Sequence, residues 1–287
     1  MNLFKSNIAE GYKDTRFIPS STSRELVARA LRVGSPFRPI RVVADVGCGS
    51  GRFLPSLANI GGIPEVWGYD LSTDMLAQAE RSVTRVANVN LVERDCAIAG
   101  VLGSEKFDLV LLHWVLNTTH AWYEVVKNCT AALRAGGVLL WFEEDGTLYR
   151  AIDGDASDCD GDGGEACAAL WTEFYKGLGS WGENDSLRKR EGLPLGSGTP
   201  VEAIANRGFT VAKLATEMAT WSRVVTVDWL INRVLAPRAF SNLSRIPTPT
   251  YDRAMNGLFK WIAAHPQVAR SPIRLRYKST PVVAVKT

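Results

Sequence analysis

The feature that most constrains this chain is a glycine-rich turn directly after a short, strongly apolar segment. Residues 40–46 read Ile-Arg-Val-Val-Ala-Asp-Val, a β-branched run typical of a strand buried in a parallel sheet. Residues 47–51 then read Gly-Cys-Gly-Ser-Gly. Glycines at the carboxyl end of a strand permit a tight turn and let the backbone approach a ligand. The pattern therefore predicts an open α/β sheet with a binding site at this end of its first strand.

The spacing of the glycines excludes two common nucleotide sites. A dinucleotide fingerprint requires the spacing G-x-G-x-x-G, but this turn reads G-x-G-x-G and position 52 is arginine. A P-loop requires Gly-Lys-Ser or Gly-Lys-Thr, which is also absent here. The turn is therefore expected to hold neither a dinucleotide pyrophosphate nor a nucleoside triphosphate.

The segments around this turn alternate between strand and helix patterns up to about residue 145. Such alternation is typical of a parallel sheet with helices on both faces. Helices are predicted at 22–33, 52–59, after Ser72, and at 122–133, and strands at 40–46, 65–69, 88–93, 107–112 and 138–142.

The pattern changes in the second half of the chain. An acidic, glycine-rich loop at 153–165 reads partly as a calcium loop, but its closing position holds Ala169 instead of glutamate, which favours a plain loop. The following segments are predicted as helices at 166–177, 226–235 and 250–264, and as strands at 208–214, 273–277 and 281–285.

Acidic residues follow the second and third predicted strands. Asp70 ends the second, where its carboxylate can accept hydrogen bonds from a ribose diol or simply cap the next helix. After the third strand, Asp95 can accept from an adenine amine and the Cys96 backbone N–H can donate to the ring, although a solvated loop aspartate remains the alternative. Because the carboxyl ends of parallel strands share one edge, these groups are expected beside the glycine-rich turn.

Together these segments resemble the class I S-adenosylmethionine-dependent methyltransferases. The resemblance covers residues 8–145 well and the closing strands loosely, and it includes Phe-Asp-Leu-Val at 107–110 and Leu-Arg-Ala-Gly-Gly at 133–137. It implies an α/β, Rossmann-like, seven-stranded and mostly parallel sheet with helices on both faces and a helical cap from C-terminal insertions. It also implies that the cofactor is S-adenosyl-L-methionine, with its methionine half at the glycine-rich loop. The residues that the resemblance assigns to the cofactor are Tyr12, Arg16, Asp45, Gly47, Cys48, Gly49, Gly51, Asp70, Leu71, Met75, Asp95, Cys96 and His113.

The N-terminal segment and one histidine carry the finer expectations. Residues 11–19 are similar to the lead-in of the trans-aconitate and ubiquinone/menaquinone methyltransferases, in which Tyr12 would cover the sulfonium and Arg16 would pair with the cofactor carboxylate, unless the segment is a plain surface helix. His113 follows the fourth strand and is the candidate catalytic base. Its alternative role is a structural histidine in the rim of the sheet.

The expected organisation is a single domain over residues 1–287. Its parts are the cofactor half 1–145, cap insertions 146–207 and 215–272, and closing strands 208–214 and 273–287. The expected function is methyl transfer by in-line displacement to an oxygen, nitrogen or carboxylate of a small molecule. The alternatives are an RNA or protein methyltransferase and a cofactor-binding protein without catalysis.

Charge and composition bear on partners and compartment. From residue 215 onward, eleven Lys and Arg stand against three Asp and Glu, whereas the remainder carries 22 against 27, so the whole chain has a net charge of +3. The basic residues are spread out, which argues against a nucleic-acid partner. No segment reaches the about 20 apolar residues of a membrane span, the start is too polar for a signal peptide, and the five cysteines show no metal-binding spacing, so a cytoplasmic protein with reduced thiols and no metal is expected.

Overall fold

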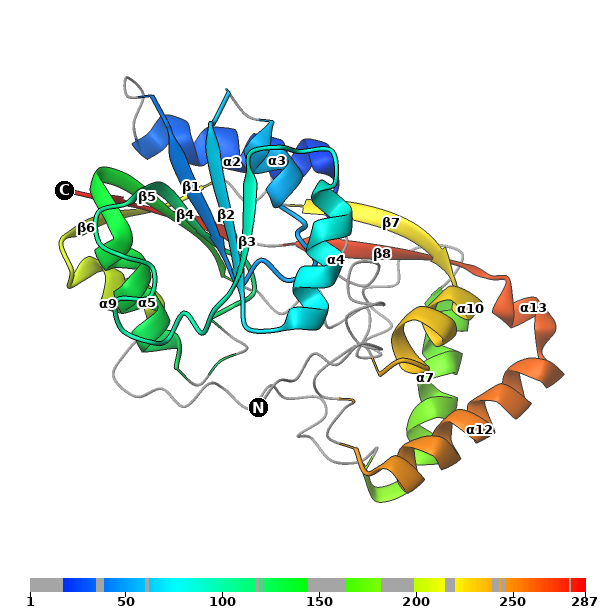
Figure 1. The fold of residues 1–287 in the computed structure, drawn as a ribbon. Coiled ribbons are helices and arrows are strands. Elements are labelled where there is room, and N and C mark those ends of the chain that lie inside the picture. The colour runs from blue at the N-terminus through cyan, green and yellow to red at the C-terminus, as the bar shows by residue number, and fades with distance from the viewer. Residues whose placement is uncertain are drawn as a thin grey trace.

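A seven-stranded sheet dominates the fold (Figure 1). The computed structural model describes residues 18–34, 39–59, 62–116, 119, 121–143, 164–181, 199–214, 220–238, 243, 246–278 and 280–287. The strand order is β3-β2-β1-β4-β5-β9-β6, and only β9 runs antiparallel to its neighbours. This confirms the predicted Rossmann-like sheet. The strands are β1 (Val42–Val46), β2 (Glu65–Asp70), β3 (Val89–Glu93), β4 (Phe107–Leu112), β5 (Leu133–Glu143), β6 (Phe209–Lys213) and β9 (Thr280–Lys286).

The two central strands are buried along their whole length. Every residue of β1 and of β4 is buried, as their largely apolar sequences predict for strands that are covered on both faces. They pair in parallel, with Val46 opposite Leu112. Because β1 and β4 end at the same level, the segments that follow them emerge side by side at one edge of the sheet.

Helices cover both faces of this sheet (Figure 1). The helices α2, α3 and α4 contribute apolar side chains to a core on one face, and α5 and α9 contribute to a second core on the other. The apolar stripe of each amphipathic helix is what it buries. The bounds are α2 (Ser20–Gly34), α3 (Leu54–Ala58), α4 (Thr73–Val83), α5 (Trp122–Ala132) and α9 (Pro200–Ala205).

The fifth strand is longer than predicted. The sequence predicts a turn at 134–137, but β5 already begins at Leu133, and the register against β4 shifts between Phe107 and Leu109. The segment therefore forms a bulge inside the strand. A Cβ on Gly137 would lie 2.7 Å from the Arg134 carbonyl oxygen, so the glycine is needed for this close backbone approach.

A second, two-stranded sheet leads from the main sheet into a helical cap (Figure 1). Strand β8 (Pro272–Lys278) pairs antiparallel with β7 (Thr220–Thr226), so of the range 273–287 only β9 joins the main sheet. Strand β7 was not predicted, although its alternation buries Trp221 and Val225. The cap helices are α7 (Gly164–Leu178), α10 (Val227–Leu230), α12 (Thr248–Ala264) and α13 (Pro266–Ala269), with a 3-10 turn at Gly179–Trp181 and a π-helix at Ile231–Leu235.

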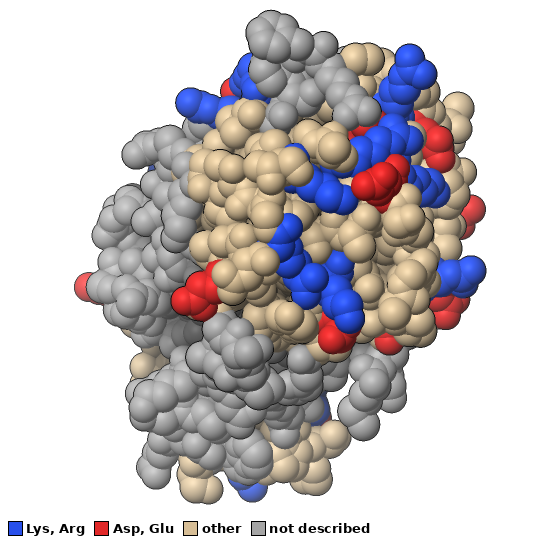
Figure 2. Space-filling model, turned by 90° about the vertical axis from the view of Figure 1, so that its left-hand side faces the viewer, with Lys and Arg blue, Asp and Glu red and all other residues tan. Residues whose placement is uncertain are grey.

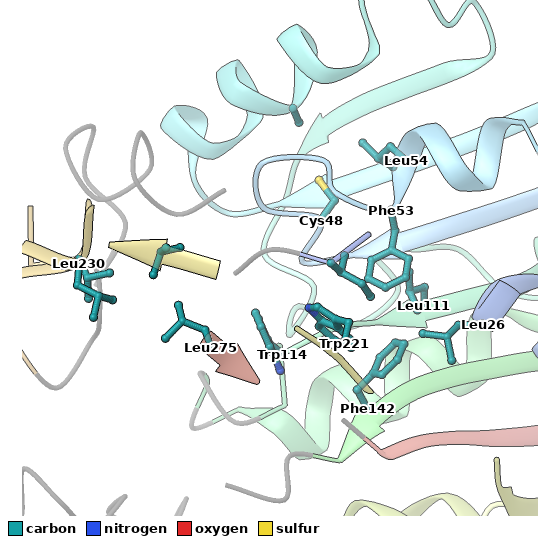
Figure 3. Close-up of a cluster of buried hydrophobic side chains, with 14 of the residues drawn as sticks. Leu26, Cys48, Phe53, Leu54, Leu111, Trp114, Phe142, Trp221, Leu230 and Leu275 are labelled. Carbon is teal, nitrogen blue, oxygen red and sulfur yellow. The ribbon is translucent and has the colours of Figure 1, made fainter. Parts of the chain in front are cut away.

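One hydrophobic core runs from the main sheet into the cap. Trp221 and Leu275 of the small sheet belong to the same buried cluster as Phe142 at the end of β5. Figure 3 shows Trp221 beside Trp114 and Phe142. The cap is therefore joined to the sheet by packed side chains as well as by chain connections. Helix α9, within the range expected to form part of the cap, instead packs against α5 beside the main sheet.

The surface and the thiols add two observations. Figure 2 shows Lys and Arg interspersed with Asp and Glu on one face of the molecule. Four cysteines are buried free thiols: Cys48, Cys96, Cys129 and Cys167. Cys159 and residues 153–163 of the predicted acidic loop lie outside the described residues, and Gly164 and Glu165 begin α7 instead of ending a loop. Within the described part of the chain, no helix is long and apolar enough to cross a membrane.

Candidate functional site

The glycine-rich loop presents bare backbone at the carboxyl end of β1. Gly47 and Gly51 have φ angles of 71° and 77°, which disfavour any residue with a side chain. A Cβ on Gly47 would lie 2.3 Å from Val115 Cγ2, and one on Gly51 would lie 2.9 Å from the Ala79 Cα atom. The loop is thus closely packed between α4 and the segment after β4, which leaves no room for side chains at these two positions.

Asp70 connects this loop to the next helix. Its Oδ2 accepts a hydrogen bond from the Gly49 N–H at 2.8 Å, and its Oδ1 accepts one from the Ser72 N–H at 2.9 Å. Burial raises the pKa of the carboxyl, and the backbone N–H donors of Ser72 and Gly49 oppose this. A carboxylate has about four lone-pair sites, so each oxygen retains capacity for a ligand hydroxyl. The ribose role of Asp70 stays a prediction.

Asp45 lies beneath the loop. It is 2% exposed, and burial raises the pKa of its carboxyl to about 8. This value includes a smaller upward effect of the Asp70 carboxyl and a downward effect of the Arg52 guanidinium. Asp45 is therefore a buried carboxyl whose protonated form is favoured by its surroundings.

The segment after β3 lies at the same edge. The Arg94 N–H donates to the Asp70 carbonyl oxygen at 2.9 Å, and Asp95 Oδ1 accepts from the Ala97 N–H at the same distance. Cys96 is buried at 8% exposure. The segment that carries Asp95 and the end of β2 are thus joined through the backbone, and the adenine role of Asp95 stays a prediction.

Sequence reasoning missed two residues at this edge. Asn128 of α5 donates from Nδ2 to the Cys96 and Ile98 carbonyl oxygens at 2.9 and 3.0 Å, which fixes the turn. Its signal was an amide on the apolar face of a helix. Ile98 is 59% exposed and Leu71 is 50% exposed, so each of these loops presents an apolar side chain to solvent. Met75, by contrast, is 1% exposed and its side chain lies in the core.

His113 is enclosed by aromatic rings. Its ring centroid lies 4.9 Å from Phe53, 4.8 Å from Phe142 and 4.4 Å from Trp114, which it stacks against. Its Nε2 atom is buried. This packing is what a structural histidine requires, while a catalytic base also needs a ring nitrogen that reaches the acceptor. The catalytic role of His113 remains a prediction.

Trp114 has an unusual backbone conformation. Its φ angle is 59°, in the left-handed region that bulky residues rarely adopt. Strain of this kind persists only where the surrounding structure holds it, and it is concentrated at functional sites. Trp114 directly follows His113 and is 6% exposed. The segment after β4 is therefore held in a fixed shape beside the glycine-rich loop.

The structure brings the predicted residues together at the carboxyl ends of β1 to β4. The loop residues with Asp45, the Asp70–Leu71 pair, the Asp95–Cys96 pair and His113 all lie at this edge. Tyr12 and Arg16 lie outside the described residues. This edge combines a glycine-rich loop with acidic side chains, and the loop lacks the G-x-G-x-x-G spacing that a pyrophosphate needs. The arrangement fits an adenosyl ligand.

Comparison with known proteins agrees with this arrangement. Residues 44–141 match a family model described as a methyltransferase domain. No curated protein matches the sequence. The matched segment runs from within β1 to within β5, so it includes β4 and most of the candidate site and resembles a methyltransferase domain.

Solved structures share the fold at low sequence identity. A Bacillus halodurans protein described as a candidate methyltransferase is 15% identical, with a TM-score of 0.50 over 91% of this chain and 98% of its own. A Haemonchus contortus N-methyltransferase in complex with phosphomonomethylethanolamine and S-adenosylhomocysteine is 17% identical, with a TM-score of 0.50 over 99% of this chain and 58% of its own. An amino pentose methyltransferase from Micromonospora echinaspora, bound to S-adenosylmethionine, is 29% identical over 46% of this chain and 54% of its own, with a TM-score of 0.39.

Proposed function

We propose that this protein transfers the methyl group of S-adenosyl-L-methionine to an oxygen, nitrogen or carboxylate of a small molecule. The matching methyltransferase domain over residues 44–141 and the sheet order support an enzyme of this class with this cofactor. The single observation that carries the proposal is the Asp70 carboxylate, which bridges the glycine-rich loop and the start of α4 at 2.8 and 2.9 Å.

Each part of the site has a proposed task. The backbone of Gly47, Cys48, Gly49 and Gly51 holds the methionine half of the cofactor, and Asp70 accepts from the ribose hydroxyls. Asp95 and the Cys96 backbone hold the adenine edge. Leu71 and Ile98 supply exposed apolar surface near it. The cofactor itself supplies a methyl group on a sulfonium, so the protein's contribution is alignment and exclusion of water.

The remaining assignments are also proposals. Tyr12 and Arg16 close over the cofactor, and Met75 contributes through the start of α4. His113 acts on the acceptor proton where the acceptor is protonated. The chain works as a single unit in which the cap insertions cover the cofactor half. The similarity of residues 11–19 supports a place in the trans-aconitate and ubiquinone/menaquinone group.

Two measurements test the proposal. Isothermal titration calorimetry with S-adenosylhomocysteine should show saturable binding that excess NADH does not compete with. Radiolabelled S-adenosylmethionine, incubated with the protein and fractionated small metabolites, should transfer its label to a low-mass fraction. Absence of binding, or label appearing only on RNA or protein, would contradict the proposal.

A further inference from the structure

Arg52 is a charged residue at this edge, and it occupies the position at which the glycine-rich turn departs from a dinucleotide-binding site. It directly follows Gly51 and is partly buried. Its guanidinium carbon lies 5.5 Å from the centroid of the Trp114 ring, within the range of a cation–π contact. Its charge also acts on the Asp45 carboxyl at the end of β1. These contacts place the guanidinium between the ends of β1 and β4.

The surroundings of Arg52 suit an anionic ligand. Trp114 is buried and stacks on the His113 ring, so the guanidinium contacts a fixed aromatic surface and loses little freedom when it binds a ligand. The neighbouring Asp45 is 2% exposed, and burial raises the pKa of its carboxyl whereas the Arg52 guanidinium lowers it, so the two groups interact at this edge. A guanidinium binds carboxylates through two parallel hydrogen bonds.

We propose that Arg52 binds a carboxylate of a small molecule at the methyl-transfer edge. This inference rests on the proposed function. Two ligands can bring a carboxylate to this position. One is the methionine half of the methyl donor, and the other is an acidic methyl acceptor. The carboxylate-binding role of Arg52 follows from its place between the two strand ends. It does not depend on Arg16, which lies outside the described residues.

The first arm of the test compares two donor-like ligands on the full chain. S-Adenosylhomocysteine carries the amino-acid carboxylate, whereas 5′-methylthioadenosine keeps the adenosyl group and sulfur and lacks that carboxylate. If the donor is the source, Arg52→Gln weakens binding of S-adenosylhomocysteine by about 10-fold or more and changes binding of methylthioadenosine by less than about 2-fold. Arg52→Lys, which keeps the charge but not the paired donors, should fall in between. Arg81→Gln, an exposed arginine on α4, is the charge-matched control and should leave both affinities unchanged.

The second arm uses succinate and its neutral diamide on the protein saturated with S-adenosylhomocysteine. If the acceptor is the source, succinate raises the melting temperature of the wild type and of Arg81→Gln but not of Arg52→Gln, and the diamide has no effect on any of them.

The remaining outcomes overturn the inference. Equal loss of S-adenosylhomocysteine and methylthioadenosine binding in Arg52→Gln would mean that the residue supports the loop instead of a carboxylate. No difference between the Arg52 variants and the wild type in either arm would mean that it binds none. A wild type that fails to bind S-adenosylhomocysteine at all would instead refute the proposed function itself, and this inference with it.

Discussion

The main sheet and the cap are held together by different kinds of contact. At the carboxyl edge of the sheet, an acidic side chain accepts hydrogen bonds from backbone N–H groups: Asp70 accepts from the N–H groups of Gly49 and Ser72 at 2.8 and 2.9 Å. In the cap, helices pack directly against each other, and a Cβ on Gly177 of α7 would lie 2.6 Å from the Ala254 Cα atom of α12. Changes at the edge of the sheet should therefore alter ligand binding, whereas changes in the cap should alter stability.

Asp70→Ala should have the largest effect, and it tests whether the edge of the sheet controls ligand binding. It removes the acceptor for two backbone donors and the proposed partner of the ribose. We expect the affinity for S-adenosylhomocysteine to fall about 100-fold, or about 3 kcal/mol, because charge-assisted hydrogen bonds are lost. Calorimetry measures the affinity, and circular dichroism checks that the variant is folded. Asp74→Ala, in the first turn of α4, serves as control. An unchanged affinity would remove the ribose assignment.

Gly177→Ala tests the cap. The added methyl group must push α7 away from the α12 backbone, so we expect a loss of about 1–2 kcal/mol of unfolding free energy. Affinity for S-adenosylhomocysteine should stay within about 2-fold, since the cap helices are outside the proposed cofactor site. Urea denaturation and calorimetry measure the two quantities, and a selective loss of binding would break the distinction between the regions.

Gly257→Ala is the matched control for this substitution. It lies on α12 with no atom within 4 Å of its added Cβ. Because alanine favours the helix and finds open space there, this variant should gain about 0.5–1 kcal/mol. Destabilisation of both glycine variants by the same amount would show that helix packing is not the cause.

The buried Asp45 predicts a pH dependence at the edge of the sheet. Its carboxyl has a pKa of about 8 in the folded chain against an ordinary aspartate value of 3.8, so between these pH values the folded state holds a proton that the unfolded state has released. Its contribution to stability is therefore full below about pH 4, falls as the pH rises, and is lost once the pH passes about 8. Relative to Asp45→Asn, the wild type should lose up to about 1.4 kcal/mol per pH unit in this window. Urea denaturation at pH 5 to 8 measures this slope, and parallel profiles for the two proteins would contradict it.

A small effect is also expected at the start of α9. Thr199 Oγ1 accepts from the Glu202 N–H at 3.3 Å, and the Glu202 carboxylate accepts from the Thr199 N–H at 2.7 Å. Thr199→Ala removes half of this capping box and should cost about 1 kcal/mol, while Thr199→Ser should cost less. Both variants should bind S-adenosylhomocysteine as the wild type does. A cost equal to that of Gly177→Ala would mean that this helix end matters as much as the cap packing.

Much of the sheet and of the cofactor edge was predictable, because their signals are local. Ser72 was expected to cap the helix after Asp70, and its Oγ accepts from the Met75 N–H at 3.3 Å. Asn128 could not be assigned a role, because its partners at Cys96 and Ile98 are about 30 residues away in sequence and are brought close only by packing of α5. Strand β7 was missed for a related reason. Its partner, β8, lies far along the chain, and the residues next to β7 do not indicate the pairing.

The sequence by itself determined the buried strands, the bend after β1 and the acids that follow β2 and β3, since apolar continuity and glycine spacing act between near neighbours. Only the tertiary structure decided which neighbours His113 and Arg52 have. It surrounded the imidazole with three rings and set the guanidinium over Trp114, because these contacts join separate strand ends that the folded sheet alone brings together.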